Sequence, residues 1–224
     1  MFSNYCVIFD MDGVLADTGP IHFESWVKMA AKIGMKFTRE MFEDTFGQQS
    51  PIITRKLVGP EVDQVLVEKW ASLKELYYRE IVKDKLIPLP GVVKTIKELK
   101  SEGFKLAVGS SGPPENVDLL LSQLKIKAYF DVIITAAEIE RGKPEPDVFL
   151  IVAKILEINP KNCLVIEDAP VGIEAAKRAG MLSIALTTTH NKEELLGAQL
   201  IIKDLTEINL IKIISLFKQN WNIQ

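Results

Sequence analysis

Residues 7–15 of this 224-residue chain read VIFDMDGVL, an apolar run that stops at two aspartates and a glycine. The run is too short for a helix and is typical of a buried strand that ends at a polar site. In open α/β sheets, ligands bind at the carboxyl ends of the strands. Asp10 and Asp12 are therefore candidates for catalysis or ligand binding.

The composition is that of an ordinary globular protein, with 47% hydrophobic residues, 25% charged residues and a net charge of −3. This charge provides no basic excess for binding a phosphate backbone, so we expect no nucleic-acid partner. No apolar segment is long enough to span a bilayer and the N-terminus lacks a signal-peptide pattern, so we expect no membrane partner and a cytoplasmic location. Cys6 and Cys163 lie in apolar runs and are expected to be reduced, buried and close together if their strands are neighbours.

Residues 20–83 carry helical patterns and no strand pattern. Thr38 and Ser50 are suited to cap helices, and the longest helical pattern covers residues 61–83. A helical segment of this kind, between a first strand and further α/β units, is an insertion. The apolar residues expected on or near the buried face of the longest helix include Val65, Leu66 and Leu76.

A proline-rich segment at residues 87–90 precedes strands that alternate with helices. The strand patterns that follow are residues 105–108, 132–135, 163–166 and 183–186, with a short last one at 200–202. This alternation predicts an α/β fold: a parallel, doubly wound (Rossmann-like) sheet of about five strands with an inserted all-helical cap domain. We expect residues 1–15 and 88–224 to form the core domain and residues 16–87 to form the cap.

Polar residues follow several of these strands. They are Asp10 and Asp12, Ser110 and Ser111, and Glu167 and Asp168, joined by Lys143 from the loop at 141–147. Parallel strands bring their carboxyl ends to one edge of the sheet, so these residues should converge. Two like charges 4 Å apart repel by about 4 kcal/mol at an effective dielectric constant of 20, so the carboxylates imply a cation. Oxygen ligands without His or Cys favour Mg²⁺.

A metal held by carboxylates, with a lysine and hydroxyl groups opposite, suits a phosphate, because phosphoryl transfer needs positioning and charge neutralisation. One aspartate can attack phosphorus and form an aspartyl phosphate. A second can give a proton to the leaving oxygen and later take one from water. The D-x-D spacing supplies both acids from one strand end.

The ordered motifs Asp10-Met11-Asp12-Gly13, Ser110, Lys143 and Glu167-Asp168 resemble those of the haloacid dehalogenase superfamily over nearly the whole chain. The resemblance implies Asp10 as the nucleophile, Asp12 as the general acid/base, and Ser110 and Lys143 as the phosphate-holding members of the catalytic set. It implies a metal site of Asp10, Asp12 (through its backbone), Glu167 and Asp168. It also implies that the helical insertion is a mobile cap with hinges at residues 16–19 and 87–90.

Residues 18–26, TGPIHFESW, closely resemble the segment of β-phosphoglucomutases that carries Thr, His and Trp at this spacing. The candidate substrate-binding residues are Thr18, His22, Trp26, Gly47, Lys74 and Ser111. Ordinary structural positions also fit some of them: Trp26 suits a helix core, His22 a partly buried helix position and Lys74 the surface.

Two departures from the mutases concern the second phosphate of a doubly phosphorylated sugar. Mutases carry an arginine three residues after the glycine that corresponds to Gly47, where this chain has Ser50, and the polar residues they carry after Ser111 are replaced here by GPP. We therefore expect a Mg²⁺-dependent phosphatase of small phosphorylated metabolites, sugar phosphates first among them, that acts through an aspartyl phosphate. The alternative is a β-phosphoglucomutase that interconverts β-glucose 1-phosphate and glucose 6-phosphate.

Two other classes of protein share the sheet. A non-enzymatic, receiver-like phospho-aspartate module uses the same acids and lysine but has no need of a helical cap. A dinucleotide-binding oxidoreductase needs G-x-G-x-x-G after its first strand, and this chain has none there. The expected partner is a small phosphorylated substrate, and the expected state is a monomer or weak homo-oligomer.

Overall fold

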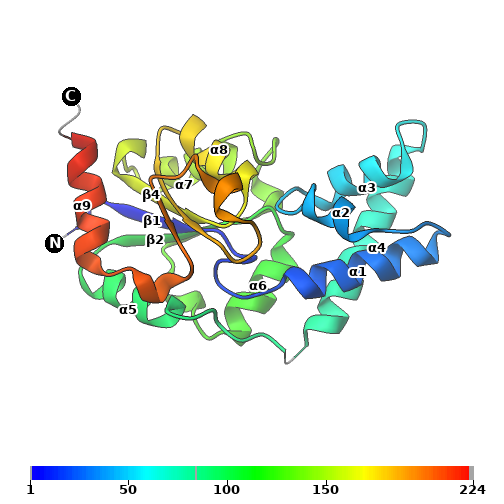
Figure 1. Ribbon diagram of the computed structural model, residues 1–224, viewed down its shortest axis with the longest axis horizontal. Helices are drawn as coiled ribbons and strands as arrows, with labels where there is room; N and C mark the ends of the chain where they lie inside the picture. Colours follow the sequence, from blue (N-terminus) through cyan, green and yellow to red (C-terminus); the bar gives the residue numbers. More distant parts are fainter. Residues whose placement is uncertain (1, 84, 222–224) are drawn as a thin grey trace.

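Six parallel strands form one sheet in the order β3-β2-β1-β4-β5-β6 (Figure 1). The computed structural model describes residues 2–83 and 85–221; the predicted domain ranges also contain residues 1, 84 and 222–224, which lie outside the described part. The strands are β1 (Cys6–Phe9), β2 (Lys105–Gly109), β3 (Val132–Ile134), β4 (Cys163–Glu167), β5 (Leu182–Leu186) and β6 (Leu200–Ile202). The predicted parallel, doubly wound sheet is confirmed, with six strands instead of about five because β6 pairs with β5 at the edge.

Helices cover both faces of the sheet (Figure 1). One face packs against α5 (Val92–Ser101), α6 (Pro114–Gln123) and α9 (Leu210–Trp221), and the other against α7 (Asp147–Ile155) and α8 (Pro170–Arg178). Val7 and Phe9 of β1 join the first hydrophobic cluster, whereas Cys6 and Ile8 join the second. Because successive side chains of a strand point to opposite faces, a strand buried on both sides is apolar throughout, as residues 6–9 are.

Short 3₁₀ helices occupy several of the connections. They are η1 (Lys127–Tyr129), η2 (Ala136–Glu138), η3 (Pro160–Asn162), η4 (Lys192–Leu195) and η5 (Leu205–Glu207). Two of them, η2 and η4, begin with a capping box, which satisfies backbone N–H groups at the start of the turn. Local hydrogen bonds therefore help to fix these two connections.

Cys6 and Cys163 stand opposite each other in the paired strands β1 and β4, as expected if their strands are neighbours. Both are free and fully buried. A hydrogen bond with the Cys163 thiol, together with burial, raises the pKa of the Cys6 thiol well above its usual value. The two cysteines thus behave as small core residues, in agreement with the sequence interpretation.

Four helices follow β1 and lie together at one end of the molecule (Figure 1). They are α1 (Gly19–Lys32), α2 (Arg39–Glu43), α3 (Ser50–Val58) and α4 (Gln64–Val82). Their shared hydrophobic cluster is built around Trp26, Met29 and Phe37 and is separate from the two clusters that flank the sheet. The inserted segment is therefore helical and has its own core.

Two details of these helices differ from the sequence prediction. The longest helix begins at Gln64, because Asp63 caps it by accepting the Val65 N–H at 2.7 Å. Ser50 is the first residue of α3 and does not cap it; its hydroxyl donates to Glu75 instead. The helical pattern places Val62, Val65, Leu66, Trp70, Leu73, Leu76, Tyr77 and Ile81 on or near one face. Ile81 is buried, and Trp70, Leu73 and Tyr77 pack against the hydrophobic cluster of the inserted helices. Val65, Leu66 and Leu76 are instead exposed, by 71%, 40% and 46%. The buried face of α4 instead carries Val67, Ala71, Lys74, Glu75 and Tyr78.

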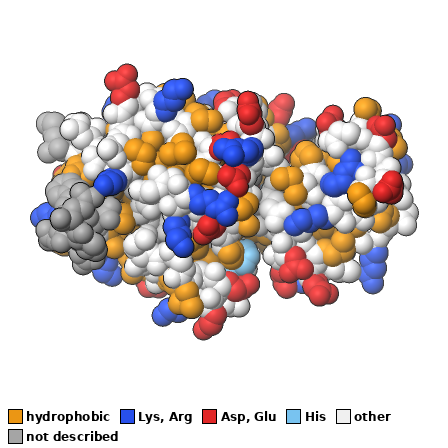
Figure 2. Space-filling model, turned by 90° about the horizontal axis from the view of Figure 1, so that it is seen from above, with side chains coloured by type: hydrophobic (Ala, Val, Ile, Leu, Met, Phe, Trp, Pro, Cys, Tyr) orange, Lys and Arg blue, Asp and Glu red, His pale blue; other side chains and the backbone are white. Residues whose placement is uncertain are grey.

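The surface carries charges of both signs. Basic and acidic side chains are interspersed on the face shown in Figure 2. Ion pairs such as Arg178 with Glu145 and Glu174, each at 2.8 Å, join neighbouring groups. Within residues 2–83 and 85–221, no helix combines the length and apolar character needed to cross a membrane.

Asp131 connects three elements and yields a prediction about stability. Its carboxylate accepts the Leu106 N–H of β2 at 2.9 Å and the Lys100 ammonium of α5 at 2.7 Å, just before β3. Partial burial would raise the pKa of Asp131, but these donors and Lys105 outweigh burial and lower it. Asp131→Asn should lower the free energy of unfolding by about 1–3 kcal/mol at pH 7, measured by urea denaturation.

The pH dependence of the stability difference, together with a second variant, serves as the control for this prediction. Because the folded-state pKa of Asp131 is lowered, the carboxylate stabilises the fold above about pH 4 and stops doing so as the pH falls through the lowered value. The difference between wild type and Asp131→Asn should therefore shrink at low pH. Asp118→Asn, at an exposed ion pair with Lys127, should change stability by less than about 0.5 kcal/mol. An equal loss in both variants would contradict the prediction.

Candidate active site

Asp10, Glu167 and Asp168 lie together at the carboxyl ends of β1 and β4. Because the two strands are paired in parallel, their ends meet, and the Asp10 N–H donates to the Ile166 carbonyl at 2.9 Å. One carboxylate oxygen from each of the three acids lies within 4.8 Å of the others, and all three residues are buried. This group, which we call the acidic group, could hold a metal ion.

Lys143 lies beside the acidic group and belongs to the loop before α7. Its ammonium donates to Asp10 Oδ1 and to Glu167 Oε1, the latter at 2.7 Å. Burial opposes the charge on Lys143, but the two carboxylates outweigh this effect and raise its pKa. The other oxygen of Glu167 accepts the N–H groups of Asp168 at 2.7 Å and Ala169 at 2.8 Å, so both oxygens of this carboxylate accept hydrogen bonds.

The charge of the acidic group is not balanced by Lys143 alone. Burial, followed by the charges of Glu167 and Asp12, raises the pKa of Asp10 to about 7 despite the lysine. Burial and the charges of Glu167 and Asp10 also raise the pKa of Asp168 well above its usual value. Oxygen ligands with uncompensated negative charge are what a hard divalent cation requires. The donor set therefore fits such a cation.

Two glycines make room for these carboxylates. A Cβ atom on Gly172 of α8 would lie 1.7 Å from Glu167 Oε1, and one on Gly13 would lie 1.9 Å from Asp168 Oδ2. Gly13 also has a φ of +77°, a conformation that L side chains rarely adopt. The glycine that follows the D-x-D pair is thus required by both the backbone and the neighbouring carboxylate.

Asp12 is one residue further along but has different partners from Asp10. Its Oδ1 accepts hydrogen bonds from Thr18 Oγ1 at 2.6 Å and from His22 Nε2 at 3.0 Å. Burial would raise the pKa of Asp12, but His22 and Thr18 outweigh it and lower the pKa. The structure therefore places the Asp12 side chain outside the acidic group and keeps it ionised.

His22 links Asp12 to the inserted helices. Its Nδ1 lies 2.7 Å from the ammonium of Lys74 on α4. Because an ammonium can only donate, Nδ1 must accept, and a neutral His22 then carries its proton on Nε2 and donates it to Asp12. The tautomer of His22 is thus set by Lys74.

Lys74 is not the surface lysine that one interpretation of the sequence allowed. It is 2% exposed, and its ammonium lies 3.0 Å from Glu75 Oε1 and 5.1 Å from the centre of the Trp26 ring. The His22 ring stacks on Tyr78 with 4.2 Å between ring centres. Burial raises the pKa of the Tyr78 hydroxyl well above its usual value, with smaller contributions from neighbouring carboxylates. Charged and aromatic side chains of α1 and α4 therefore form one wall of the site.

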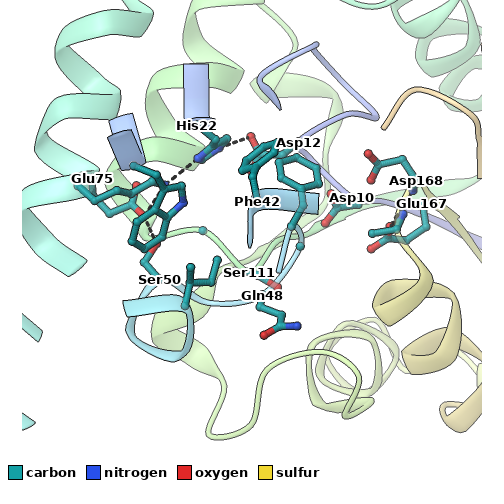
Figure 3. Close-up of a pocket in the computed structure, with 17 residues that line it drawn as sticks. Asp10, Asp12, His22, Phe42, Gln48, Ser50, Glu75, Ser111, Glu167 and Asp168 are labelled. Carbon is teal, nitrogen blue, oxygen red and sulfur yellow. Dashed lines mark hydrogen bonds and ion pairs between the residues drawn. The ribbon is translucent and has the colours of Figure 1, made fainter. Parts of the chain in front are cut away.

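A single pocket joins the acidic group, Asp12 and this wall (Figure 3). Of the predicted site residues, its lining contains Asp10, Asp12, His22, Trp26, Gly47, Lys74, Ser111, Glu167 and Asp168. The other three contact it indirectly: Thr18 through Asp12, Lys143 through Asp10, and Ser110 through a hydrogen bond that its Oγ accepts from the Gly112 N–H at 3.0 Å. The Ser111 hydroxyl is buried in the lining and has no hydrogen-bond partner among the residues that the structure describes.

Sequence reasoning missed several residues of the pocket. Phe42, Gln48 and Glu75 line it, and no local pattern marks them as functional. Thr189 donates to Asp168 Oδ2, and this residue could have been found, because a run of three threonines follows β5 at the same edge of the sheet.

The doubly wound sheet and the acidic group at its carboxyl edge define an α/β enzyme whose site could hold a metal ion. Residues 7–186 match the haloacid dehalogenase-like hydrolases. The chain belongs to this family.

Individual relatives are similar over nearly their whole length. The β-phosphoglucomutase of Bacillus subtilis is 33% identical over 91% of this chain and 91% of its own. The phosphorylated carbohydrates phosphatase of Thermotoga maritima is 31% identical over 92% of this chain and 97% of its own. Among solved structures, β-phosphoglucomutase from Clostridium difficile has a TM-score of 0.89 and 28% identity, and covers 98% of this chain and 99% of its own. The relatives thus include both a mutase and a phosphatase.

The acidic group leads to two predictions about thermal stability, one for a mutation and one for metal binding. Asp168→Asn removes a carboxylate that burial and its neighbours destabilise, so the metal-free variant should melt at a higher temperature than metal-free wild type. Mg²⁺ at 100 times its dissociation constant should stabilise wild type by about 2.7 kcal/mol and the variant much less. Thermal melting with Mg²⁺ or EDTA measures both effects. A variant that melts lower without metal and gains as much from Mg²⁺ as wild type would contradict the prediction; Asp118→Asn is the control.

Proposed function

We propose that the protein is a Mg²⁺-dependent phosphatase of small phosphorylated metabolites, sugar phosphates first among them, that works through an aspartyl phosphate on Asp10. The observation that carries the proposal is the buried acidic group with Lys143, which leaves negative charge uncompensated beside a pocket that also contains Asp12. Relatives named as phosphatases and mutases support it.

In this mechanism Asp10 and Asp12 have separate tasks. Asp10 attacks phosphorus, and a new O–P bond forms as the bond between phosphorus and the ester oxygen breaks. Asp12 in its protonated form gives its proton to the leaving oxygen and becomes ionised. Asp12, which Thr18 and His22 keep ionised, takes the proton from the water that hydrolyses the aspartyl phosphate. That proton is then available to the leaving oxygen of the next substrate.

Other residues position these two aspartates. Lys143 holds Asp10 and offers positive charge to phosphate oxygens. Asp10, Glu167 and Asp168 would hold Mg²⁺ with their carboxylates, and Asp12 would contribute its backbone carbonyl. The ion, when bound, neutralises phosphate charge. Ser110 and Ser111 would add hydroxyl groups at the phosphate end of the pocket.

We also propose that residues 16–87 form a cap domain on a core domain of residues 1–15 and 88–224. The separate hydrophobic cluster of α1–α4 supports this division. The two connections run side by side, since Ala16 pairs with Pro88 and the Leu89 N–H donates to the Leu15 carbonyl at 3.0 Å. Hinges at residues 16–19 and 87–90 would let the cap close over a small-molecule substrate and exclude bulk water.

β-Phosphoglucomutase activity is the second candidate, and the path from Asp12 through His22 to Lys74 favours it, because it places acid/base and cap residues in direct contact. A mutase must hold both phosphates of its intermediate. Ser50 and Gly112 stand where resemblance to the mutases calls for groups that grip the second phosphate, which supports hydrolysis instead.

Replacing the nucleophile tests the covalent mechanism. Asp10→Asn should reduce phosphate release from any substrate by at least about 1,000-fold, because the amide is not a nucleophile, while thermal melting shows the fold retained. Asp17→Asn, which changes an exposed aspartate in the same loop, should keep wild-type activity. Release at the wild-type rate by Asp10→Asn would disprove the role of Asp10.

The products distinguish the two candidate reactions. Wild-type protein with Mg²⁺ should release inorganic phosphate over many turnovers from a panel of sugar phosphates, nucleotides and phosphoglycolate. Conversion of β-glucose 1-phosphate into glucose 6-phosphate with little free phosphate would instead show a mutase. A protein that releases no phosphate over multiple turnovers and isomerises no substrate would contradict both candidates.

A further inference from the structure

The end of the pocket farthest from the acidic group contains a carboxylate. In Figure 3, Ser50 and Glu75 lie on the opposite side of the pocket from Glu167 and Asp168. Both line the pocket, and Glu75 is only 7% exposed. Nothing in the phosphatase mechanism above uses Glu75, so its burial at this position requires another explanation.

The cation beside Glu75 is already engaged. Of the residues that the structure shows in the pocket lining, none is arginine and only Lys74 is lysine. The Lys74 ammonium contacts Glu75 Oε1 at 3.0 Å and His22 Nδ1 at 2.7 Å, and it faces the Trp26 and Tyr78 rings. The charge of this ammonium is thus already balanced by Glu75, so a phosphate that reached it would also meet the buried carboxylate.

The Glu75 carboxylate is held in place from both the inserted helices and the helices beside the sheet. The Ser50 hydroxyl donates to Oε1, and Asn116 Nδ2 of α6 donates to Oε2 at 2.6 Å. Arg79 donates to Asn116 Oδ1 at 2.9 Å, which fixes the amide with its nitrogen toward Glu75. Burial would raise the pKa of Glu75, but the charge of Lys74 and hydrogen bonds from Ser50 and Lys74 outweigh it and lower the pKa, so the group is ionised at neutral pH.

An ionised carboxylate has about four acceptor positions. Lys74, Ser50 and Asn116 occupy three of those on Glu75, which leaves room for one more donor. A sugar or polyol hydroxyl supplies such a donor, whereas a phosphate group supplies only oxygens and negative charge. A negatively charged ligand group that lies beside a carboxylate of the site is repelled, so ligands with such a group bind less tightly than ligands without it.

We propose that Glu75 is a specificity-determining residue, which selects phosphate monoesters that carry hydroxyl groups at their far end and rejects those with a second phosphate there. The proposal rests on the phosphatase function proposed above and narrows its substrate class to singly phosphorylated sugars or polyols. Asn116 and Arg79 act through Glu75 and are positioning residues.

The first test compares matched substrates with wild-type protein. Fructose 1-phosphate and glucose 6-phosphate are each paired with the corresponding bisphosphate, fructose 1,6-bisphosphate and glucose 1,6-bisphosphate. In the pair whose monophosphate is hydrolysed more efficiently, kcat/KM should be at least about tenfold higher for the monophosphate than for the bisphosphate. Most of this difference should lie in KM. Equal kcat/KM values for both members of each pair would overturn the proposal.

The second test changes the charge at Glu75. Glu75→Gln keeps the shape and an acceptor oxygen but removes the charge, so it should reduce the preference for monophosphate at least about fivefold, mainly by lowering KM for the bisphosphate. Glu80→Gln makes the same change at an exposed position of α4 and should keep the wild-type preference. A merely structural role would lower kcat for both substrates alike and leave their ratio unchanged, which would overturn the proposal.

A binding measurement separates this proposal from the phosphatase function. Calorimetry with Asp10→Asn protein and Mg²⁺ should show weaker binding of each bisphosphate than of its monophosphate, with the difference reduced when Glu75→Gln is added. Equal binding would overturn the role of Glu75 even if wild-type protein releases phosphate. Unequal binding without phosphate release by wild type would support the role of Glu75 and contradict the phosphatase function.

Discussion

The burial of three carboxylates beside one lysine is the constraint on which the rest of the site depends. Lys143 contacts Asp10 and Glu167, and backbone N–H groups satisfy the remaining oxygen of Glu167. Within the described part of the chain, the Asp168 carboxylate accepts a hydrogen bond only from the Thr189 hydroxyl, and it stays crowded by its neighbours. Such an arrangement is unfavourable by itself, so the surrounding fold must hold it. The parallel pairing of β1 with β4, both buried on two faces, provides that support and fixes where the carboxylates stand.

The part of the fold that sequence could predict is the part in which local pattern and long-range packing agree. Central strands are buried on both faces, so the runs at residues 6–9 and 163–166 are apolar throughout and easily distinguished from helices. The parallel topology then brings their polar ends together, which is why the acidic group was predictable. β6, Leu200–Ile202, is an edge strand of only three residues; its pattern is present in the sequence, although the expected count of about five falls one short of the six strands.

The far end of the pocket was not predictable, because its chemistry depends on contacts between distant segments. Amphipathic patterns assign charged residues to the solvent side of a helix, so α4 was expected to bury Leu66 and Leu76. In the structure α4 is turned so that Lys74 and Glu75 are buried instead. Their burial is tolerated only because partners arrive from α1, α3 and α6, and no spacing within α4 indicates those partners.

One polar path connects the two ends of the pocket. It begins at Asn116 on α6, passes through Glu75, Lys74 and His22, and ends at Asp12 beside β1. Lys74 is shared, because its ammonium offsets the charge of Glu75 and also sets the tautomer with which His22 donates to Asp12. Any displacement of α4 from α6 would therefore disturb both the far-end carboxylate and the hydrogen bond that keeps Asp12 ionised. The ionisation of Asp12 is in this way tied to the position of helices far from it in sequence, so that, in the mechanism proposed above, the inserted segment contributes to catalysis as well as covering the substrate.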